Sequence, residues 1–245
     1  MHQNIIDLTL ASALTESSIQ RPESDSSFKL VVFCAMQVTI TLIIIIITVA
    51  VSLYTMQQPA ILNSLMMNPY QVVHSGQYYR MISSGFIHRD HMHLIFNMFS
   101  FYFFGTQLEY IFKEIFGSLG SVHFIALYIL GIVVSDIPTV IKNHKNIHYN
   151  SLGASGAVSA VVFACILFLP LRDICIYGVF CFPGFILGIG YLIYSYFSSR
   201  KSNDGINHDA HLYGALFGII YCIVFFPDSI RIFIEQMGEW KIPFF

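Results

Sequence analysis

A serine, two histidines and an asparagine lie near the starts of three apolar segments. These are the side chains that a hydrolase with a serine nucleophile needs. Ser155 lies in Gly-Ala-Ser-Gly, His93 and Asn97 are four residues apart on one helix face, and His211 opens the last apolar segment. A serine hydroxyl becomes a nucleophile when a histidine takes its proton, and the resulting oxyanion needs preorganised donors. The sequence therefore predicts Ser155 as nucleophile and His211 as base. The side chains of His93 and Asn97, with backbone N–H groups at the helix start, are the predicted oxyanion donors.

Each of these residues also has a purely structural interpretation. Ser155 could cap or pack a helix, His211 could be a buried histidine with a satisfied hydrogen bond, and Asn97 could bond a backbone carbonyl. The Gly153–Ala157 stretch is not the nucleophile elbow of α/β-hydrolases, because it ends in alanine and no strand precedes it. A metal site is a second alternative, and its candidate ligands are His88, His91, His93, His208 and His211, with Asp90 and Asp209 as the nearby acids. An HExxH motif is absent, so serine chemistry is preferred.

The composition identifies the environment in which this chemistry would take place. The chain is 56% hydrophobic and only 11% charged, against about 25% charged residues in soluble domains. Its formal net charge of -2 offers no basic field for nucleic acid. We therefore expect an all-α, polytopic membrane protein.

Six segments have the length and apolarity of membrane-spanning helices. They cover 30–54, 92–112, 121–141, 154–171, 175–198 and 209–227. The polar clusters open the second, fourth and sixth segments. If the segments alternate in direction, these three ends lie at similar depth on one side of the bilayer, which favours one composite site.

The rest of the chain is assigned to tails and connections. We expect a polar tail over 1–29 with a weakly amphipathic piece near Ile5 to Leu14, a membrane domain over 30–228 and a short tail over 229–245. The long connection 55–91 is semi-apolar and is expected to lie partly in the membrane interface. The cysteines fall in or beside apolar runs without a CxxC pair, which predicts small buried side chains and no disulfide framework.

Small residues predict close packing of the fourth and sixth segments. Gly214 and Gly218 are four residues apart, and Gly156, Ala160 and Ala164 repeat at the same step. This spacing allows two helices to approach closely in lipid. The same contact would bring Ser155 and His211 together.

With these motifs in order, the chain resembles the rhomboid intramembrane serine proteases, and most closely their bacterial members. The match covers roughly residues 60 to 227. It consists of Tyr79-Arg80 in the first loop, His93-xxx-Asn97, Gly153-x-Ser155-Gly156 and His211-xx-Gly214-xxx-Gly218.

The resemblance implies a six-helix bundle that uses a Ser155–His211 dyad without an acid, a cofactor or a metal. His93, Asn97 and the Ser155 amide would form the oxyanion hole. Glu109 matches an acidic position with a structural role. The substrates would be single-pass transmembrane proteins in the lipid bilayer, cut near the ends of their helices, with water reaching the site from the non-cytoplasmic side. A catalytically silent relative that binds membrane clients is the alternative.

The same resemblance supplies an orientation. Lys and Arg residues near the helix ends divide evenly between the two sides, so the positive-inside rule does not decide. Family membership would place both termini in the cytoplasm and the protein in a bacterial inner membrane.

Two positions depart from the family pattern. The first loop of the family often has Trp-Arg where this chain has Tyr79-Arg80, a mild change that keeps an aromatic side chain at the interface. Many members carry an aromatic residue four positions after the serine, stacked on the catalytic imidazole, where this chain has Ser159. The imidazole is then expected to be held by Phe163 or to be looser.

Asp209 lies two residues before His211, and on a helix this spacing is poor for orienting the imidazole. Asp209 is therefore interpreted as a loop or cap residue. Pro183-Gly184 would break the fifth segment and help a substrate helix enter sideways.

Overall fold

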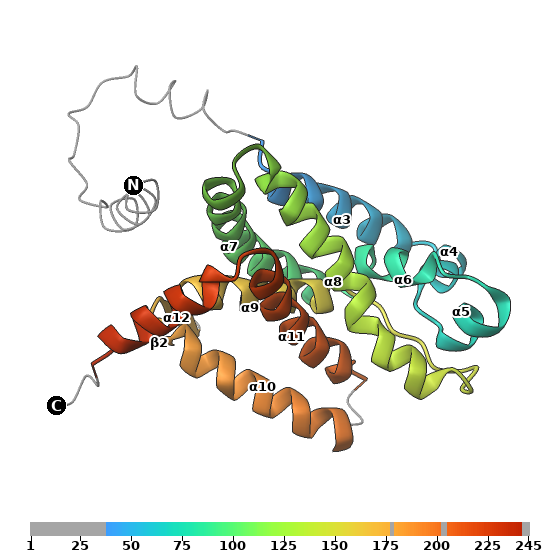
Figure 1. Ribbon diagram of the computed structural model, residues 1–245. Coiled ribbons are helices and arrows are strands. Elements are labelled where there is room, and N and C mark those ends of the chain that lie inside the picture. The colour runs from blue at the N-terminus through green and yellow to red at the C-terminus, as the bar shows by residue number, and fades with distance from the viewer. Residues whose placement is uncertain (1–37, 177–178, 202–204, 242–245) are drawn as a thin grey trace. The chain divides into compact units, whose positions relative to one another are not determined.

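The computed structural model describes residues 38–176, 179–201 and 205–241 (Figure 1). The chain divides into two compact units, Met1–Thr39 and Ile40–Phe245. Nearly all of the first unit lies outside the described residues. The expected polar tail 1–29, the start of the first apolar segment and Cys34 are therefore outside them as well. The second unit contains all of the elements discussed below.

The second unit is built mostly of helices, and each of the six expected segments overlaps one long helix. These helices are α3 (Ile40–Met56), α7 (His91–Phe116), α8 (Gly120–Asn143), α9 (Ser155–Phe168), α10 (Gly184–Lys201) and α11 (His208–Phe225). Gly117 adopts a φ of 55° between α7 and α8, where the short 3₁₀ helix η2 (Gly117–Leu119) turns the chain.

The long connection after α3 is also helical, in short pieces. It contains α4 (Pro59–Leu65), α5 (Pro69–Ser75), α6 (Arg80–Ser83) and the 3₁₀ helix η1 (Ser84–Phe86). Pro59 and Pro69 start their helices where a missing N–H costs nothing, and the Asn68 side chain caps α5 by accepting from the Gln71 amide at 2.9 Å. A further amphipathic helix, α12 (Asp228–Glu239), follows α11 and was not among the expected elements.

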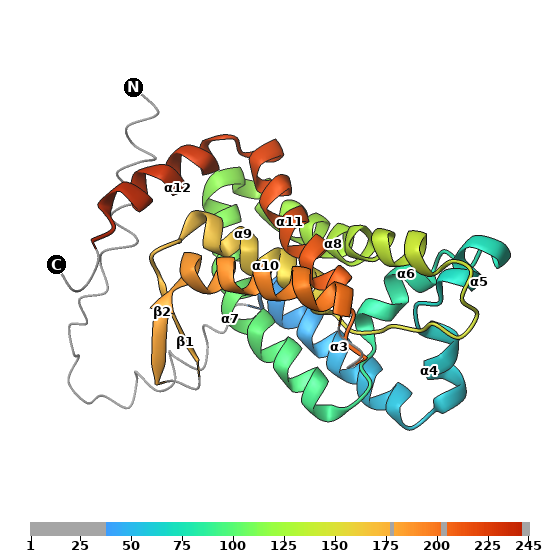
Figure 2. The same ribbon diagram turned by 90° about the horizontal axis from the view of Figure 1, so that it is seen from below.

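Helix α9 occupies the centre of the helical unit. In both views α7, α8, α10 and α11 surround it (Figures 1 and 2), and nearly every residue after Ser155 is buried. Its sequence is apolar or small on all sides, as expected for a helix without a water-facing stripe. A side chain at its first turn is thus held by packing from several directions.

Helices α9 and α11 approach each other closely through the predicted small residues. A Cβ atom added at Gly214 would lie 2.9 Å from the carbonyl carbon of Gly156, and one at Gly218 would lie 2.8 Å from Cα of Ala160. Real Cβ atoms essentially never come so close to backbone. Only glycine at both positions permits this contact, which fixes the start of α11 against the start of α9.

The fifth expected segment, 175–198, is wrong in its first part. Strands β1 (Asp173–Ile176) and β2 (Phe180–Pro183) form an antiparallel hairpin, and α10 begins only at Gly184. β-Branched and aromatic residues favour this pairing over a helix. Pro183-Gly184 therefore marks a strand-to-helix junction and does not break a span.

The hairpin also corrects the prediction for the cysteines. Cys175 and Cys181 are cross-strand partners and form a disulfide. The sequence analysis missed it because the two cysteines are six positions apart and do not form a CxxC motif. Cys165 and Cys222 are free and buried, as predicted.

Two stretches of the described chain are long and apolar enough to cross a membrane. One covers His91–Asn143, in which an 18-residue window has a mean hydropathy of 2.2, and it consists of α7 and α8 packed against each other. The other is α11, whose 18 residues have a mean hydropathy of 1.3. Helices α3 and α9 are apolar but shorter. By length and composition alone, this is fewer than the six spans that the sequence predicts.

Candidate active site

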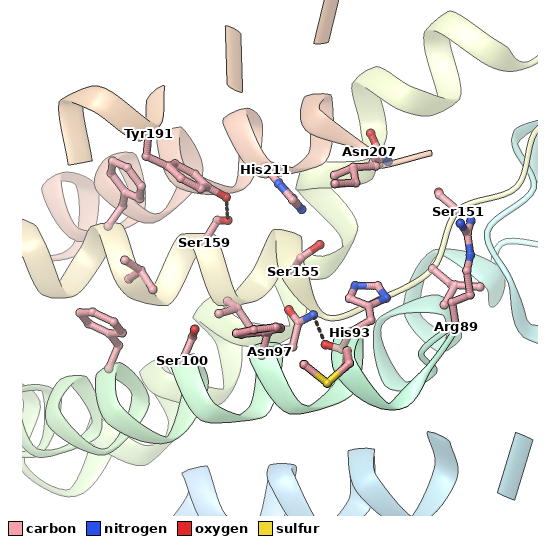
Figure 3. A pocket seen from close by; sticks show the side chains of 18 of the residues that line it. Arg89, His93, Asn97, Ser100, Ser151, Ser155, Ser159, Tyr191, Asn207 and His211 are labelled. Atoms are coloured by element: carbon pink, nitrogen blue, oxygen red, sulfur yellow. Dashed lines mark hydrogen bonds between the residues drawn. The ribbon is translucent and has the colours of Figure 1, made fainter. Parts of the chain in front are cut away.

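The candidate site is a cleft of about 690 Å³ whose lining includes Ser155, His211, His93 and Asn97. The walls come from α7, α10 and α11, and α9 forms the floor (Figure 3). This volume is typical of ligand-binding clefts. The structure thus brings together four residues that the sequence analysis took from three separate segments.

Ser155 is the first residue of α9 and lies beside the imidazole of His211. Figure 3 shows the serine hydroxyl on the side of the helix that faces the His211 ring. The first N–H groups of a helix have no intrahelical acceptor, and the positive end of its dipole favours negative charge. The position therefore suits a nucleophile whose reaction generates an oxyanion.

Gly153 shapes the loop that leads to Ser155. Its φ of 121° is strained for any residue with a side chain, and an added Cβ would lie 2.6 Å from Cε1 of His93. Glycine is thus required both for the turn and for the approach of the imidazole. The contact packs His93 against the loop that carries the serine.

A buried histidine that the sequence analysis considered only as a metal ligand holds the same loop. Nε2 of His88 accepts the amide N–H of Ala154 at 3.3 Å, so Nδ1 carries the proton and donates to Oγ of Ser52 at 2.9 Å. Oγ of Ser52 in turn donates to the Phe86 carbonyl at 3.1 Å. His88 is fully buried in the loop before α7, and burial, with the nearby His93, lowers its pKa from 6.5 to about 3. It is a neutral bridge from α3 to the residue before Ser155.

His93 and Asn97 lie one turn apart on α7, next to the start of α9. The side-chain amide of Asn97 donates to the His93 carbonyl at 2.9 Å, which leaves its second N–H for another acceptor. The Asp90 carboxylate caps α7 by accepting the His93 amide at 2.8 Å, and this bond is the main reason why the pKa of Asp90 is lowered. The cap fixes the first turn of α7, on which His93 stands.

The aromatic ring stacked with His211 is Tyr191 of α10. The two ring centroids are 6.2 Å apart and the planes differ by 20°. The tyrosine hydroxyl forms a hydrogen bond with Oγ of Ser159 at 3.0 Å (Figure 3). Phe163 instead packs against Tyr191, with the two ring centroids 5.7 Å apart. The expectation that Phe163 holds the imidazole is thus corrected. No signal in the sequence gives the rotation of α10 that brings Tyr191 to this place.

Arg80 and Glu109 lie away from the cleft and hold connections. The buried Arg80 guanidinium donates to the carbonyls of Asn63 and Met66 at 2.9 and 2.8 Å, which ties α6 to the end of α4. The Glu109 carboxylate accepts the amides at the start of α3 and the hydroxyl of Thr41, and it pairs with Lys113 at 2.7 Å. Both residues thus act on the scaffold.

Asp209 and the histidine-rich segments complete the list of candidates. Asp209 lies in the first turn of α11 and forms an ion pair with Lys142 at 3.1 Å. Within residues 38–176, 179–201 and 205–241, no three histidine, cysteine or acidic side chains are grouped so that they could hold a metal ion.

The helical fold and the arrangement of these motifs define a membrane-embedded helical domain of the rhomboid type. Residues 75–228 match the Rhomboid domain family, and the chain belongs to this family. It is an integral membrane protein by this membership.

Two relatives illustrate the range of the family. The chain is 29% identical over 193 residues to the rhomboid protease GlpG of Haemophilus influenzae, which covers 77% of this chain and 92% of that protein. It is 27% identical over 157 residues to the mitochondrial RHOMBOID-like protein 12 of Arabidopsis thaliana. That match covers 58% of this chain and only 44% of the plant protein, less than half of its length.

Proposed function

We propose that the chain is an intramembrane serine endopeptidase that cleaves transmembrane segments of other membrane proteins with a Ser155–His211 dyad. The observation that carries this proposal is the meeting of Ser155, His211, His93 and Asn97 in one cleft. Membership of a family that contains a protease 29% identical to this chain supports it. The same proposal includes a bundle of six spans in a bacterial inner membrane, with both termini on the cytoplasmic side.

The dyad would work in two steps. In the first, His211 takes the Ser155 proton while Oγ attacks the scissile carbonyl, and the tetrahedral oxyanion accepts bonds from the Ser155 amide, His93 and Asn97. His211 then gives the proton to the leaving amine, so the peptide bond breaks and an acyl-enzyme remains. In the second, His211 activates water, which hydrolyses the ester and regenerates the serine.

The cleft also suggests how a substrate would reach the dyad. Its lining includes Phe96, Ser100 and Phe104 from α7 and Leu187 and Gly188 from α10. An apolar trough between two helices suits an unwinding transmembrane segment better than a soluble peptide. A disulfide that tethers α10 to α7 across the cleft should therefore block cleavage of a helical substrate, and undiminished cleavage would refute this route.

The proposal is tested with wild type, Ser155→Ala and His211→Ala, purified in detergent and incubated with a single-span substrate. We expect wild type to cut and to react with a fluorophosphonate, and both folded variants to do neither. Cleavage by Ser155→Ala would disprove the mechanism. Folded wild type that neither cuts nor reacts would instead indicate a silent relative that binds membrane clients.

A further inference from the structure

Tyr191 makes two contacts at the edge of the cleft that together fix its ring. One is the stacking on His211, with the centroids 6.2 Å apart and the planes 20° from parallel. The other is the hydrogen bond between its hydroxyl and Oγ of Ser159 at 3.0 Å. In Figure 3 the Tyr191 side chain reaches from α10 towards α9, and the His211 ring lies next to it.

The surroundings of Tyr191 indicate that this placement is specific. Ser159 is buried, so a hydroxyl at this position needs a partner, and it finds one on another helix. Phe163, one turn further along α9, packs against the same tyrosine ring, with the two ring centroids 5.7 Å apart. The Tyr191 ring is therefore held by a polar bond at its hydroxyl and by a tilted apolar contact with the Phe163 ring.

We propose that Tyr191 is a positioning residue for the His211 imidazole, and that Ser159 in turn positions Tyr191. This inference rests on the proposed function, in which one imidazole nitrogen must face Oγ of Ser155 before and after the proton moves. A ring parallel to the imidazole limits its rotation about the bond to Cβ. Offset aromatic contacts of this separation have energies that correspond to roughly a threefold to tenfold change in rate.

The proposal makes the catalytic geometry depend on α10. Ser155 and His211 stand on α9 and α11, which pack tightly through their glycines, whereas α10 makes a much smaller contact with α9. A shift of α10 away from α9 would break the bond to Ser159 and withdraw the ring from His211. The helix that lines the cleft thus also orients the base.

The test measures kcat and KM for a single-span substrate, the rate of labelling by a fluorophosphonate and the Tm of each variant. Tyr191→Ala should lower kcat and the labelling rate roughly threefold to tenfold, with KM and Tm near wild type. Tyr191→Phe should have a kcat between those of wild type and Tyr191→Ala, because the ring remains but its bond to Ser159 is lost. Tyr196→Ala, an exposed tyrosine on the same helix, is the matched control and should match wild type.

A double variant separates positioning from packing. In Tyr191→Ala the space next to position 159 is vacated, so Ser159→Phe in that background supplies a ring from α9 instead of α10. Positioning by a ring predicts that kcat recovers towards wild type. A merely structural role of Tyr191 predicts no recovery of kcat.

Four results would overturn the inference. They are unchanged kcat and labelling in Tyr191→Ala, a rise in KM alone, a loss of activity that follows Tm, and failure of both Tyr191→Phe and the double variant to restore kcat. If wild type cleaves and Ser155→Ala does not, any of these refutes the role of Tyr191 and leaves the proposed function intact. If wild type neither cleaves nor labels, the proposed function fails and the inference fails with it.

Discussion

Replacing His88 with glutamine should remove a pH dependence of folding from this protein. His88 is buried and neutral, and it bridges Ser52 and the Ala154 amide. Its pKa is lowered from 6.5 to about 3 in the folded protein, mainly by burial. Between these values the unfolded chain binds a proton that the folded chain excludes, so acid favours unfolding.

The size of the effect follows from the two pKa values. A depressed histidine pKa contributes stability that is present above the unfolded pKa near 6.5 and is lost as the pH falls towards 3. Integrating between pH 7 and pH 5 gives a loss of roughly 2 kcal/mol in the free energy of unfolding. Glutamine does not titrate, so this contribution should be missing from the variant.

The assay is reversible unfolding in detergent micelles at pH 7, 6 and 5, for wild type and His88→Gln. The variant should be less stable at pH 7, since its amide cannot reproduce both hydrogen bonds, but its stability should fall less on acidification. The difference between the two slopes isolates His88 from the carboxylates, which also titrate. His74→Gln, at an exposed histidine on α5, is the matched control for a histidine-to-glutamine change outside the site.

An equal loss of stability on acidification in wild type and His88→Gln would refute the reasoning. It would mean that folding does not exclude a proton from His88, although a proton on Nε2 removes the acceptor of the Ala154 amide. A steeper slope in the variant would be equally damaging, because glutamine adds no titrating group.

Three further predictions concern packing, charge and the hairpin. Gly214→Ala should lower the free energy of unfolding by about 1–3 kcal/mol through overlap with α9, whereas Gly190→Ala, with open space around it, should not destabilise. Glu109→Gln should cost about 1.5–3 kcal/mol, because the buried carboxylate accepts several charge-assisted bonds, and thermal unfolding would show no loss if these bonds are dispensable. Cys181→Ser should reduce hairpin stability by about 2 kcal/mol, seen as faster proteolysis between β1 and β2; equal proteolysis would contradict this.

Much of the fold was predictable because long apolar segments in a sequence indicate membrane-spanning helices. The ends of α7, α8 and α11 fall within a few residues of the expected segments. The close contact of α9 with α11 was readable from glycine spacing, since only a missing Cβ allows it. The hairpin 173–183 was not, because a short run of β-branched and aromatic residues suits a strand as well as a membrane helix.

Some residues of the candidate site could be predicted from the sequence, and others could not. Ser155, His93, Asn97 and His211 could be selected because chemistry requires these side chains and each opens an apolar segment. His88 and Tyr191 could not be assigned their contacts, because these depend on how distant helices are rotated about their axes. Hydrophobic periodicity gives the buried face of a helix but not which neighbour that face meets.

The separation of Ser155 and His211 along the chain has a consequence for biogenesis. The serine is synthesised with α9, but its proposed base arrives only with α11, after the disulfide hairpin and α10 have been made. A nascent chain that has inserted α9 alone has no imidazole from α11 beside the serine. If the dyad is the catalytic machinery, the chain is inactive while it is being inserted into the membrane. Activity then begins only when α11 packs against α9.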